Sequence, residues 1–181
     1  MFRTAAAITF AALLSASSGV VAAETPASAK AEIKDAAGAV VGLATFMPGK
    51  DGVLVHIEVT GLPPGWHGLH LHAKGDCSGA KFSGAGGHIM PPIMGGMMPA
   101  HGLLNANGPE PGDLPNLFVG ADGKGAAEFY TRGVLLTPEG ALPALLDADG
   151  AALVIHANRD DQTTQPTGGS GDRIACGVIA P

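Results

Sequence analysis

The 181-residue chain has few aromatic residues (4%) and few charged residues (14%). It contains no long block of like charge, and its formal net charge is −6. Nucleic-acid-binding domains usually present a basic face, so this balance excludes nucleic acid as an expected partner. Because aromatic side chains are scarce, valine, leucine, isoleucine and alanine must fill the core.

The chain also lacks an uninterrupted apolar run of the roughly 20 residues that cross a membrane. Residues 5–16 are mostly apolar, but small polar residues interrupt the stretch from Ser15 onward. Arg3 precedes it, and the small residues Val21 to Ala23 suit a cleavage site. We therefore expect a signal peptide over 1–23, a loose tail over 24–30 and one domain over 31–181. The mature protein would have no membrane span and would be periplasmic or secreted.

Only two cysteines are present, Cys77 and Cys176. An exported protein meets an oxidising compartment, where an even pair of cysteines predicts one disulfide. The bond would close a loop of about 100 residues, worth on the order of 4–5 kcal/mol in the chain-entropy treatment.

No segment has a convincing amphipathic helical period. Apolar residues instead recur at every second position, as in Val53, Val55, Ile57 and Val59. This alternation is typical of a half-buried strand. Turn residues separate several such segments. They lie at 31–35, 38–47, 52–60, 67–73, 116–119, 126–130, 135–146, 151–156 and 173–179. We expect an all-β fold, a Greek-key sandwich or barrel of about eight strands with immunoglobulin-like architecture.

Two segments do not follow the strand pattern. Residues 74–113 are rich in glycine and proline, and residues 157–172 are polar. Loops of this length inside a compact domain are uncommon and usually functional.

Seven histidines offer ligands for a transition metal. His70 and His72 are two residues apart on an expected strand, so both point to the same face. His67 is an odd number of residues from His70 and should point to the other face, while isolated His56 is expected to be structural. The remaining candidate ligands lie in loops or at a strand end: His88, His101, Asp113 and His156.

Several motifs resemble the bacterial (periplasmic) copper,zinc superoxide dismutases. They are "GWHGLHLHAKGDC", "SGAGGH", "GDLPN", "LVIHANRDD" and "GSGDRIACGVI", in that order from about residue 31 to the C-terminus. The resemblance implies disproportionation of superoxide to dioxygen and hydrogen peroxide by Cu(II)/Cu(I) cycling. It implies copper on His70, His72, His88 and His156.

The resemblance also implies zinc on His101 and Asp113, with His88 bridging the two metals. It makes Asp160 a carboxylate that orients His70 and His101, and it pairs Cys77 with Cys176. Arg173 would attract the superoxide anion and Thr167 would narrow its channel. The catalytic roles thus fall on Arg173 and His88.

The chain departs from the family at Glu110, which stands where the family has a zinc-binding histidine. Glutamate oxygen is an acceptable zinc ligand, so one alternative is a site of two histidines and two carboxylates. The other, which we favour slightly, is a weakened or empty zinc site. Copper and zinc are therefore both expected cofactors, with zinc dependent on this position.

Four of the six methionines lie between the two loop histidines, in "HIMPPIMGGMMPAH". Thioethers from Met90 to Met98 could capture Cu(I), although an adaptable apolar contact surface is the interpretation we favour. A non-enzymatic copper-binding or copper-delivery protein on the same scaffold is the alternative function. A pure carrier would not need Arg173. The sequence leaves monomer and homodimer equally open.

Overall fold

The computed structural model describes Met1, residues 28–92 and residues 97–181. The expected signal peptide, most of the expected tail and Met94 lie outside these residues. Within them, no helix has the length and apolar character that crossing a membrane requires.

The described chain folds into one antiparallel sheet of nine strands, one more than expected. The order across the sheet is β4-β6-β7-β3-β2-β1-β9-β8-β5. The strands are β1 Ala29–Asp35, β2 Val40–Gly49, β3 Gly52–Val59, β4 Gly65–His67, β5 Leu69–His72, β6 Leu117–Val119, β7 Gly125–Thr131, β8 Ala151–His156 and β9 Arg173–Ile179. A short 3-10 element, η1, covers Ala80–Ala85.

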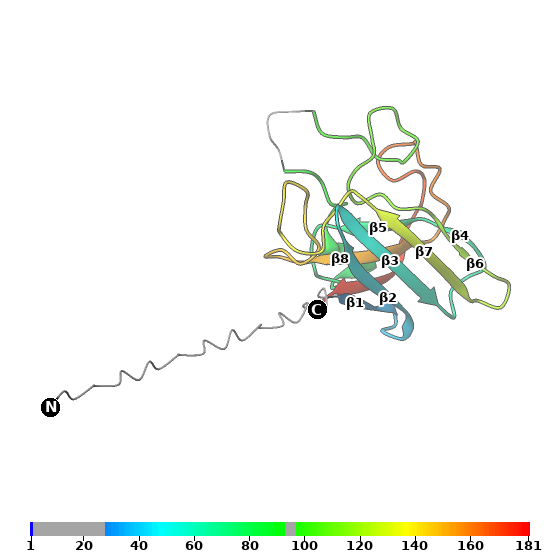
Figure 1. Ribbon diagram of the computed structural model, residues 1–181. Helices are drawn as coiled ribbons and strands as arrows, with labels where there is room; N and C mark the ends of the chain where they lie inside the picture. The colour runs from blue at the N-terminus through cyan, green and yellow to red at the C-terminus, as the bar shows by residue number, and fades with distance from the viewer. Residues whose placement is uncertain (2–27, 93–96) are drawn as a thin grey trace.

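The sheet curls into a nearly closed barrel (Figure 1). Strands β4 and β5 lie at opposite ends of the strand order, yet only Gly68 separates them in the chain. The ends of the sheet must therefore meet at Gly68. A side chain there would collide with Ser170, so glycine allows the 157–172 loop to approach closely. This break also divides the single strand expected over 67–73.

The core consists of small and branched aliphatic side chains, as the scarcity of aromatics predicts. In β3, Val53, Val55, Ile57 and Val59 are all buried, which confirms the alternation. Two expectations were wrong. β1 begins at Ala29, a buried residue, so the tail is shorter than expected. Residues 135–146 form no strand, because Pro138, Gly140 and Pro143 interrupt the pattern; only an isolated bridge joins Leu135 to Ala144.

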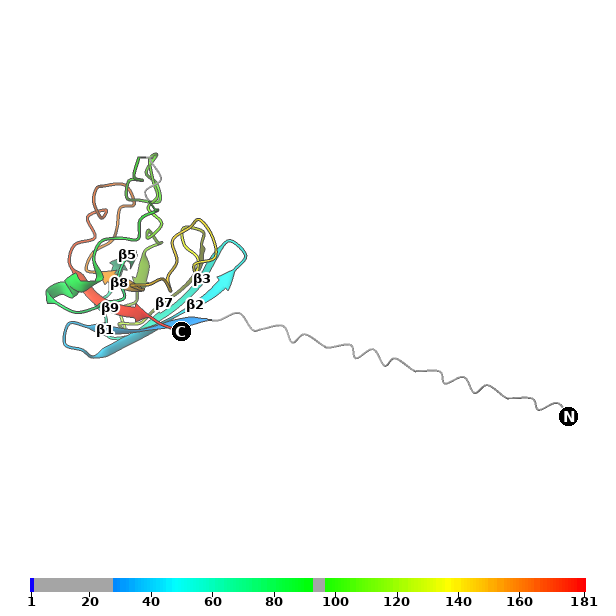
Figure 2. The same cartoon turned by 90° about the vertical axis from the view of Figure 1, so that its left-hand side faces the viewer.

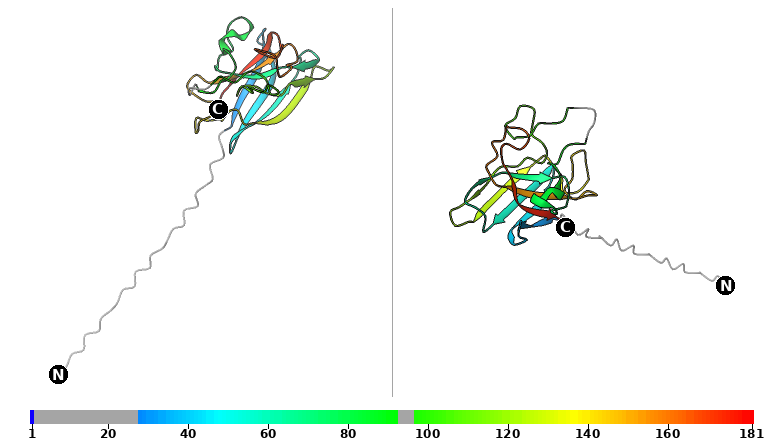
Figure 3. Two further views of the ribbon diagram at one scale, coloured as in Figure 1. Left: turned by 90° about the horizontal axis from the view of Figure 1, so that it is seen from above. Right: turned by 180° about the vertical axis from the view of Figure 1, so that it is seen from behind.

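The two long loops rise together from one side of the barrel, as Figures 1 and 2 show. The view from behind in Figure 3 gives the same arrangement. A disulfide between Cys77 and Cys176 fastens the first loop to β9, as expected. The barrel thus serves as a rigid base for the loops that carry most of the remaining candidate ligands.

Candidate metal centre

Backbone hydrogen bonds fix the 74–113 loop against β5 at two points, Ile89 and Gly112. The amide of Leu71 donates to the carbonyl of Gly112, and the carbonyl of Leu71 accepts from the amide of Ile89. Isolated bridges join His72 to His88 and His70 to Asp113. Main-chain pairing therefore places the loop residues His88 and Asp113 beside the two histidines of β5.

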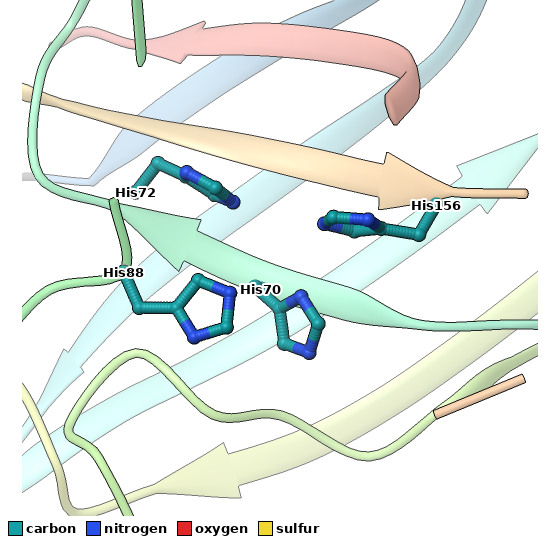
Figure 4. Close-up of side chains that lie close together, drawn as sticks. All are labelled: His70, His72, His88 and His156. Atoms are coloured by element: carbon teal, nitrogen blue, oxygen red, sulfur yellow. The ribbon is translucent and has the colours of Figure 1, made fainter. Parts of the chain in front are cut away.

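Four imidazoles converge at this point (Figure 4). They come from β5, from the loop and from the end of β8, and all are buried. One ring nitrogen of each lies within 4.8 Å of the others. Each ring also has one buried nitrogen without a hydrogen-bond partner: Nδ1 of His70 and Nε2 of His72, His88 and His156. Buried polar atoms are normally paired, so four unpaired imidazole nitrogens in one place fit a bound metal ion.

The opposite nitrogen of three rings donates to an anchored acceptor. His72 Nδ1 donates to the carbonyl of Gly86 at 2.9 Å, and His156 Nδ1 to that of Gly171 at 3.1 Å. His70 Nε2 donates to Oδ2 of Asp160 at 2.7 Å. Carbonyl and carboxylate oxygens only accept here, so the inward nitrogen of each neutral ring keeps its lone pair.

Burial keeps these rings neutral. Desolvation lowers the pKa of His72 to about 2 and that of His156 to about 4. Desolvation also lowers the pKa of His70, although its hydrogen bond to Asp160 acts in the opposite direction. A transition metal binds the neutral imidazole, so the fold presents these ligands in their metal-binding form.

A second cluster lies directly beside the first and shares His88. It contains the four zinc candidates His88, His101, Glu110 and Asp113, whose ligand atoms lie within 4.8 Å of one another. Oε2 of Glu110 is 2.7 Å from Nδ1 of His88, and Oδ1 of Asp113 is 2.7 Å from Nδ1 of His101. Two nitrogens and two carboxylate oxygens form a donor set that suits zinc. Glu110 is thus in place to act as a ligand.

The electrostatics of this cluster are opposite to those of the first. Burial disfavours a charged His101, but hydrogen bonds to Asp113 and Asp160 outweigh it and raise its pKa to about 10. Attraction to the nearby carboxylates of Asp113 and Glu110 likewise overcomes the burial of His88 and raises its pKa. The pKa of Asp113 falls well below its usual range, because the bond to His101 and the nearby His88 outweigh its own desolvation. In the absence of metal, protonated His88 and His101 therefore balance the negative charge of the carboxylates, which a bound cation would otherwise balance.

Asp160 connects the two clusters. Its Oδ2 accepts a hydrogen bond from Nε2 of His70 at 2.7 Å, and its Oδ1 accepts one from Nε2 of His101 at 3.2 Å. Asn116 holds its backbone on both sides: the Asn116 side chain donates to the Asp160 carbonyl and accepts from the Asp160 amide. Gly168 makes the space, since a side chain there would collide with the carboxylate. Asn116 falls in the "GDLPN" motif, but its role could not be deduced from that motif alone.

Arg173 begins β9 next to the first cluster. Nη1 donates to the carbonyl of Phe82 at 2.8 Å, and Nη2 donates to that of Gly86 at 2.6 Å. The neighbouring Asp172 pairs with Lys81 instead, and no ion pair of Arg173 occurs among the residues that the structure describes. Its guanidinium helps to line a surface pocket of about 320 Å³.

The remaining candidates lie outside both clusters. The ring nitrogens of His67 lie 2.7 and 2.8 Å from the carbonyl oxygens of His156 and Pro63, and His67 belongs to neither cluster. The strand is interrupted at Gly68, so side-chain parity does not apply to His67. His56 is half-buried and lies near two surface glutamates, as a structural histidine would. Thr167 is half-buried in the second loop.

The side chain of Met97 is 96% exposed and that of Met98 is 44% exposed. Methionines this exposed do not fill a core. Copper capture and surface contact both stay predictions for this segment.

Comparison with known proteins agrees with this geometry. A sequence model of the copper/zinc superoxide dismutase (SODC) family matches residues 40–179. The chain is 48% identical over 152 residues to a Cu-Zn superoxide dismutase from Caulobacter vibrioides, covering 84% of this chain and 85% of that protein. It is 40% identical over 161 residues to a Cu-Zn superoxide dismutase from Deinococcus radiodurans, covering 83% of this chain and 82% of that protein.

Solved structures show the same similarity. A double mutant of a superoxide dismutase-like protein from Bacillus subtilis superposes with a TM-score of 0.76 at 38% identity, covering 84% of this chain and 97% of that one. A Cu/Zn superoxide dismutase from Brucella abortus superposes with a TM-score of 0.66 at 28% identity, covering 85% of this chain and all of that one (100%).

Proposed function

The chain belongs to the copper/zinc superoxide dismutase family, and on that premise we propose which of its residues perform the reaction. The family's enzymes are oxidoreductases that convert superoxide to dioxygen and hydrogen peroxide, and copper and zinc are their metals. We assign copper to the cluster of four unpartnered imidazole nitrogens, from His70, His72, His88 and His156. That convergence is the single observation on which the assignment rests.

Zinc belongs to the adjacent cluster, on His88, His101, Glu110 and Asp113. The two carboxylates complement the charge of the cation. Asp160 orients one ring from each cluster, which restrains both sites through a single side chain. The expectation that Glu110 weakens zinc binding stays a prediction.

Copper, when bound, supplies the one-electron oxidation and reduction that the two halves of the reaction need. The protein has to admit a small anion, hold it and deliver protons. Arg173 is the cation for this purpose, because its charge lies beside the copper ligands and is not neutralised by Asp172. His88 is the shared ligand; when copper is reduced, its Nε2 would be free of the metal and would hold the proton that the product peroxide takes up.

Thr167 and the 157–172 loop form the channel wall in this proposal. Residues 1–23 are removed on export, and the mature domain acts in the periplasm or outside the cell. Superoxide is the only partner that the proposal requires, and it leaves monomer and homodimer open.

The test is the rate of superoxide dismutation by the copper- and zinc-loaded protein, with metal content measured on the same sample. His156→Ala removes one copper ligand and should reduce both copper content and rate by at least about 100-fold. His56→Ala is the matched control, because this histidine is half-buried on the surface of β3 and lies outside both clusters. A loaded wild-type protein without activity, or equal effects of the two substitutions, would refute the assignment.

A further inference from the structure

We propose that Glu110 has a second role beside zinc ligation: in the zinc-free protein its carboxylate holds Nδ1 of His88 and keeps Nε2 of that ring directed at the copper site. Glu110 is then a positioning residue for copper, acting through His88. The proposal rests on the assignment of copper to the four-histidine cluster.

His88 is the copper ligand that most needs such support. The other three lie in β5 and β8. The ring nitrogens that face away from the copper site are bonded to Asp160, Gly86 and Gly171, groups that zinc would not displace. His88 lies in a loop, and its outer nitrogen faces the zinc cluster. Without another partner, that ring would lose its orienting contact whenever zinc is absent.

Glu110 is the carboxylate that supplies the contact. Its Oε2 is 2.7 Å from Nδ1 of His88, whereas Oδ1 of Asp113 is 3.5 Å away, too far for a good hydrogen bond. Both oxygens of the Asp113 carboxylate also have closer partners: Oδ1 contacts His101 at 2.7 Å, and Oδ2 accepts the amides of Gly102 and Glu110. Asp113 therefore orients His101, and Glu110 orients His88.

The backbone places Glu110 for this task. Its amide donates to Oδ2 of Asp113 at 2.9 Å, and its carbonyl accepts the Asp113 amide at 3.0 Å. Pro109 and Pro111 restrict the chain on either side. The side chain of Glu110 is only 13% exposed, so water competes weakly with the contact. A histidine–carboxylate bond of this kind is charge-assisted and stronger than a neutral one.

The consequence is a copper site that zinc is not needed to assemble. A histidine at position 110 would offer a neutral ring in place of the carboxylate, and the charge-assisted bond to His88 would be lost. Wild-type protein should thus depend less on zinc for its copper geometry than a Glu110→His variant does.

The experiment compares wild type, Glu110→His, Glu110→Gln and Glu110→Ala, each loaded with copper in the presence or absence of zinc. Two readouts are the Cu(II) electron paramagnetic resonance spectrum and the copper affinity in competition with a chelator. Glu139→Ala is the matched control, since Glu139 is exposed and lies outside the clusters. Circular dichroism and disulfide content establish that every variant is folded.

For wild type and Glu139→Ala we expect the same spectrum with and without zinc, and affinities within about threefold. Zinc-free Glu110→Ala and Glu110→His should show altered spectra and about 10- to 100-fold weaker copper binding, the range typical for loss of an orienting partner. Glu110→Gln keeps an accepting oxygen and should fall between. Zinc should restore the Glu110→His spectrum.

Two outcomes would overturn the proposal. One is a zinc-free Glu110→Ala protein with an unchanged spectrum and affinity. The other is a wild-type spectrum that changes on zinc removal as much as that of Glu110→Ala. Failure of the copper assignment itself would look different, because copper would then not bind to the four histidines even in wild-type protein loaded with both metals.

Discussion

His72 and Arg173 donate to the same oxygen, the carbonyl of Gly86, at 2.9 Å and 2.6 Å respectively. One peptide group thus orients a proposed copper ligand and the cation proposed to attract superoxide. The disulfide at Cys77 fastens the loop that carries this peptide to β9, the strand that Arg173 begins. The position of the 74–113 loop therefore determines both the orientation of His72 and the position of the Arg173 charge.

Replacement of Arg173 should separate its charge from its hydrogen bonds. Arg173→Ala should lower the rate constant for superoxide by about tenfold or more, because local attraction of an anion raises association rates by roughly 10- to 1,000-fold. Arg173→Lys keeps the charge but loses the two-pronged contact, so its loss should be smaller. Stopped-flow measurement tests this. Arg132→Ala, an equal charge change at an exposed residue, is the control, and equal rates for the two alanine variants would contradict the prediction.

The wild-type rate should fall as salt concentration rises, because ions screen the attraction between Arg173 and superoxide. Arg173→Ala should show a clearly flatter dependence. The measurement is the dismutation rate over a series of ionic strengths at fixed pH. A wild-type profile as flat as that of the variant would rule out steering by this residue.

Removal of the disulfide should cost about 4 kcal/mol of the free energy of unfolding, since the bond joins residues 99 positions apart. The double substitution Cys77→Ala with Cys176→Ala also frees the peptide at Gly86, so copper affinity should fall as well. Urea unfolding and chelator competition measure the two effects. A loss below about 1 kcal/mol with unchanged affinity would be inconsistent with the linkage.

The stability of the metal-free protein should be highest near pH 6.5 and fall on both sides. The folded-state pKa values of His72 and His156 are lowered to about 2 and about 4, so below pH 6.5 the unfolded chain binds more protons and stability falls. The pKa of His101 is raised to about 10, so its contribution is full below pH 6.5 and is lost as pH rises toward 10. Urea unfolding at a series of pH values checks this; a monotonic profile from pH 4 to 10 would contradict it.

Asp160→Asn should weaken both metals together. The carboxylate accepts from His70 through Oδ2 and from His101 through Oδ1, whereas an asparagine can accept through one oxygen only and cannot orient both rings in this way. We expect about 10- to 100-fold lower affinity for copper and for zinc, measured by competition. Asp161→Asn, an exposed neighbour, is the control. A variant that loses only one metal would show that the two sites are not coupled through Asp160.

The sequence predicts the proposed ligands from two sources, the strand period and the family resemblance. His70 and His72 share a face through the period of the strand, and the structure brings together the loop ligands that the resemblance implies. The pairing of Cys77 with Cys176 follows from the absence of any other cysteine. These inferences need no long-range geometry.

The inferences that fail, or that the sequence cannot provide, depend on contacts between distant segments. Residues 135–146 have strand-like composition, but prolines and a glycine prevent ladder pairing. The division of the strand at Gly68 follows from closure of the barrel against Ser170. The orientation of Asp160 by Asn116 joins positions 44 residues apart, and the 2.7 Å contact of Glu110 with His88 depends on loop packing. Such contacts are set by the assembled fold.

Anomalous X-ray diffraction from crystals of the copper- and zinc-loaded protein, collected at the absorption edge of each metal, tests the central claim most directly. We predict a copper peak bounded by nitrogens of His70, His72, His88 and His156. We predict a separate zinc peak bounded by His88, His101, Glu110 and Asp113. Copper located elsewhere, or a zinc peak that Glu110 does not contact, would contradict the account.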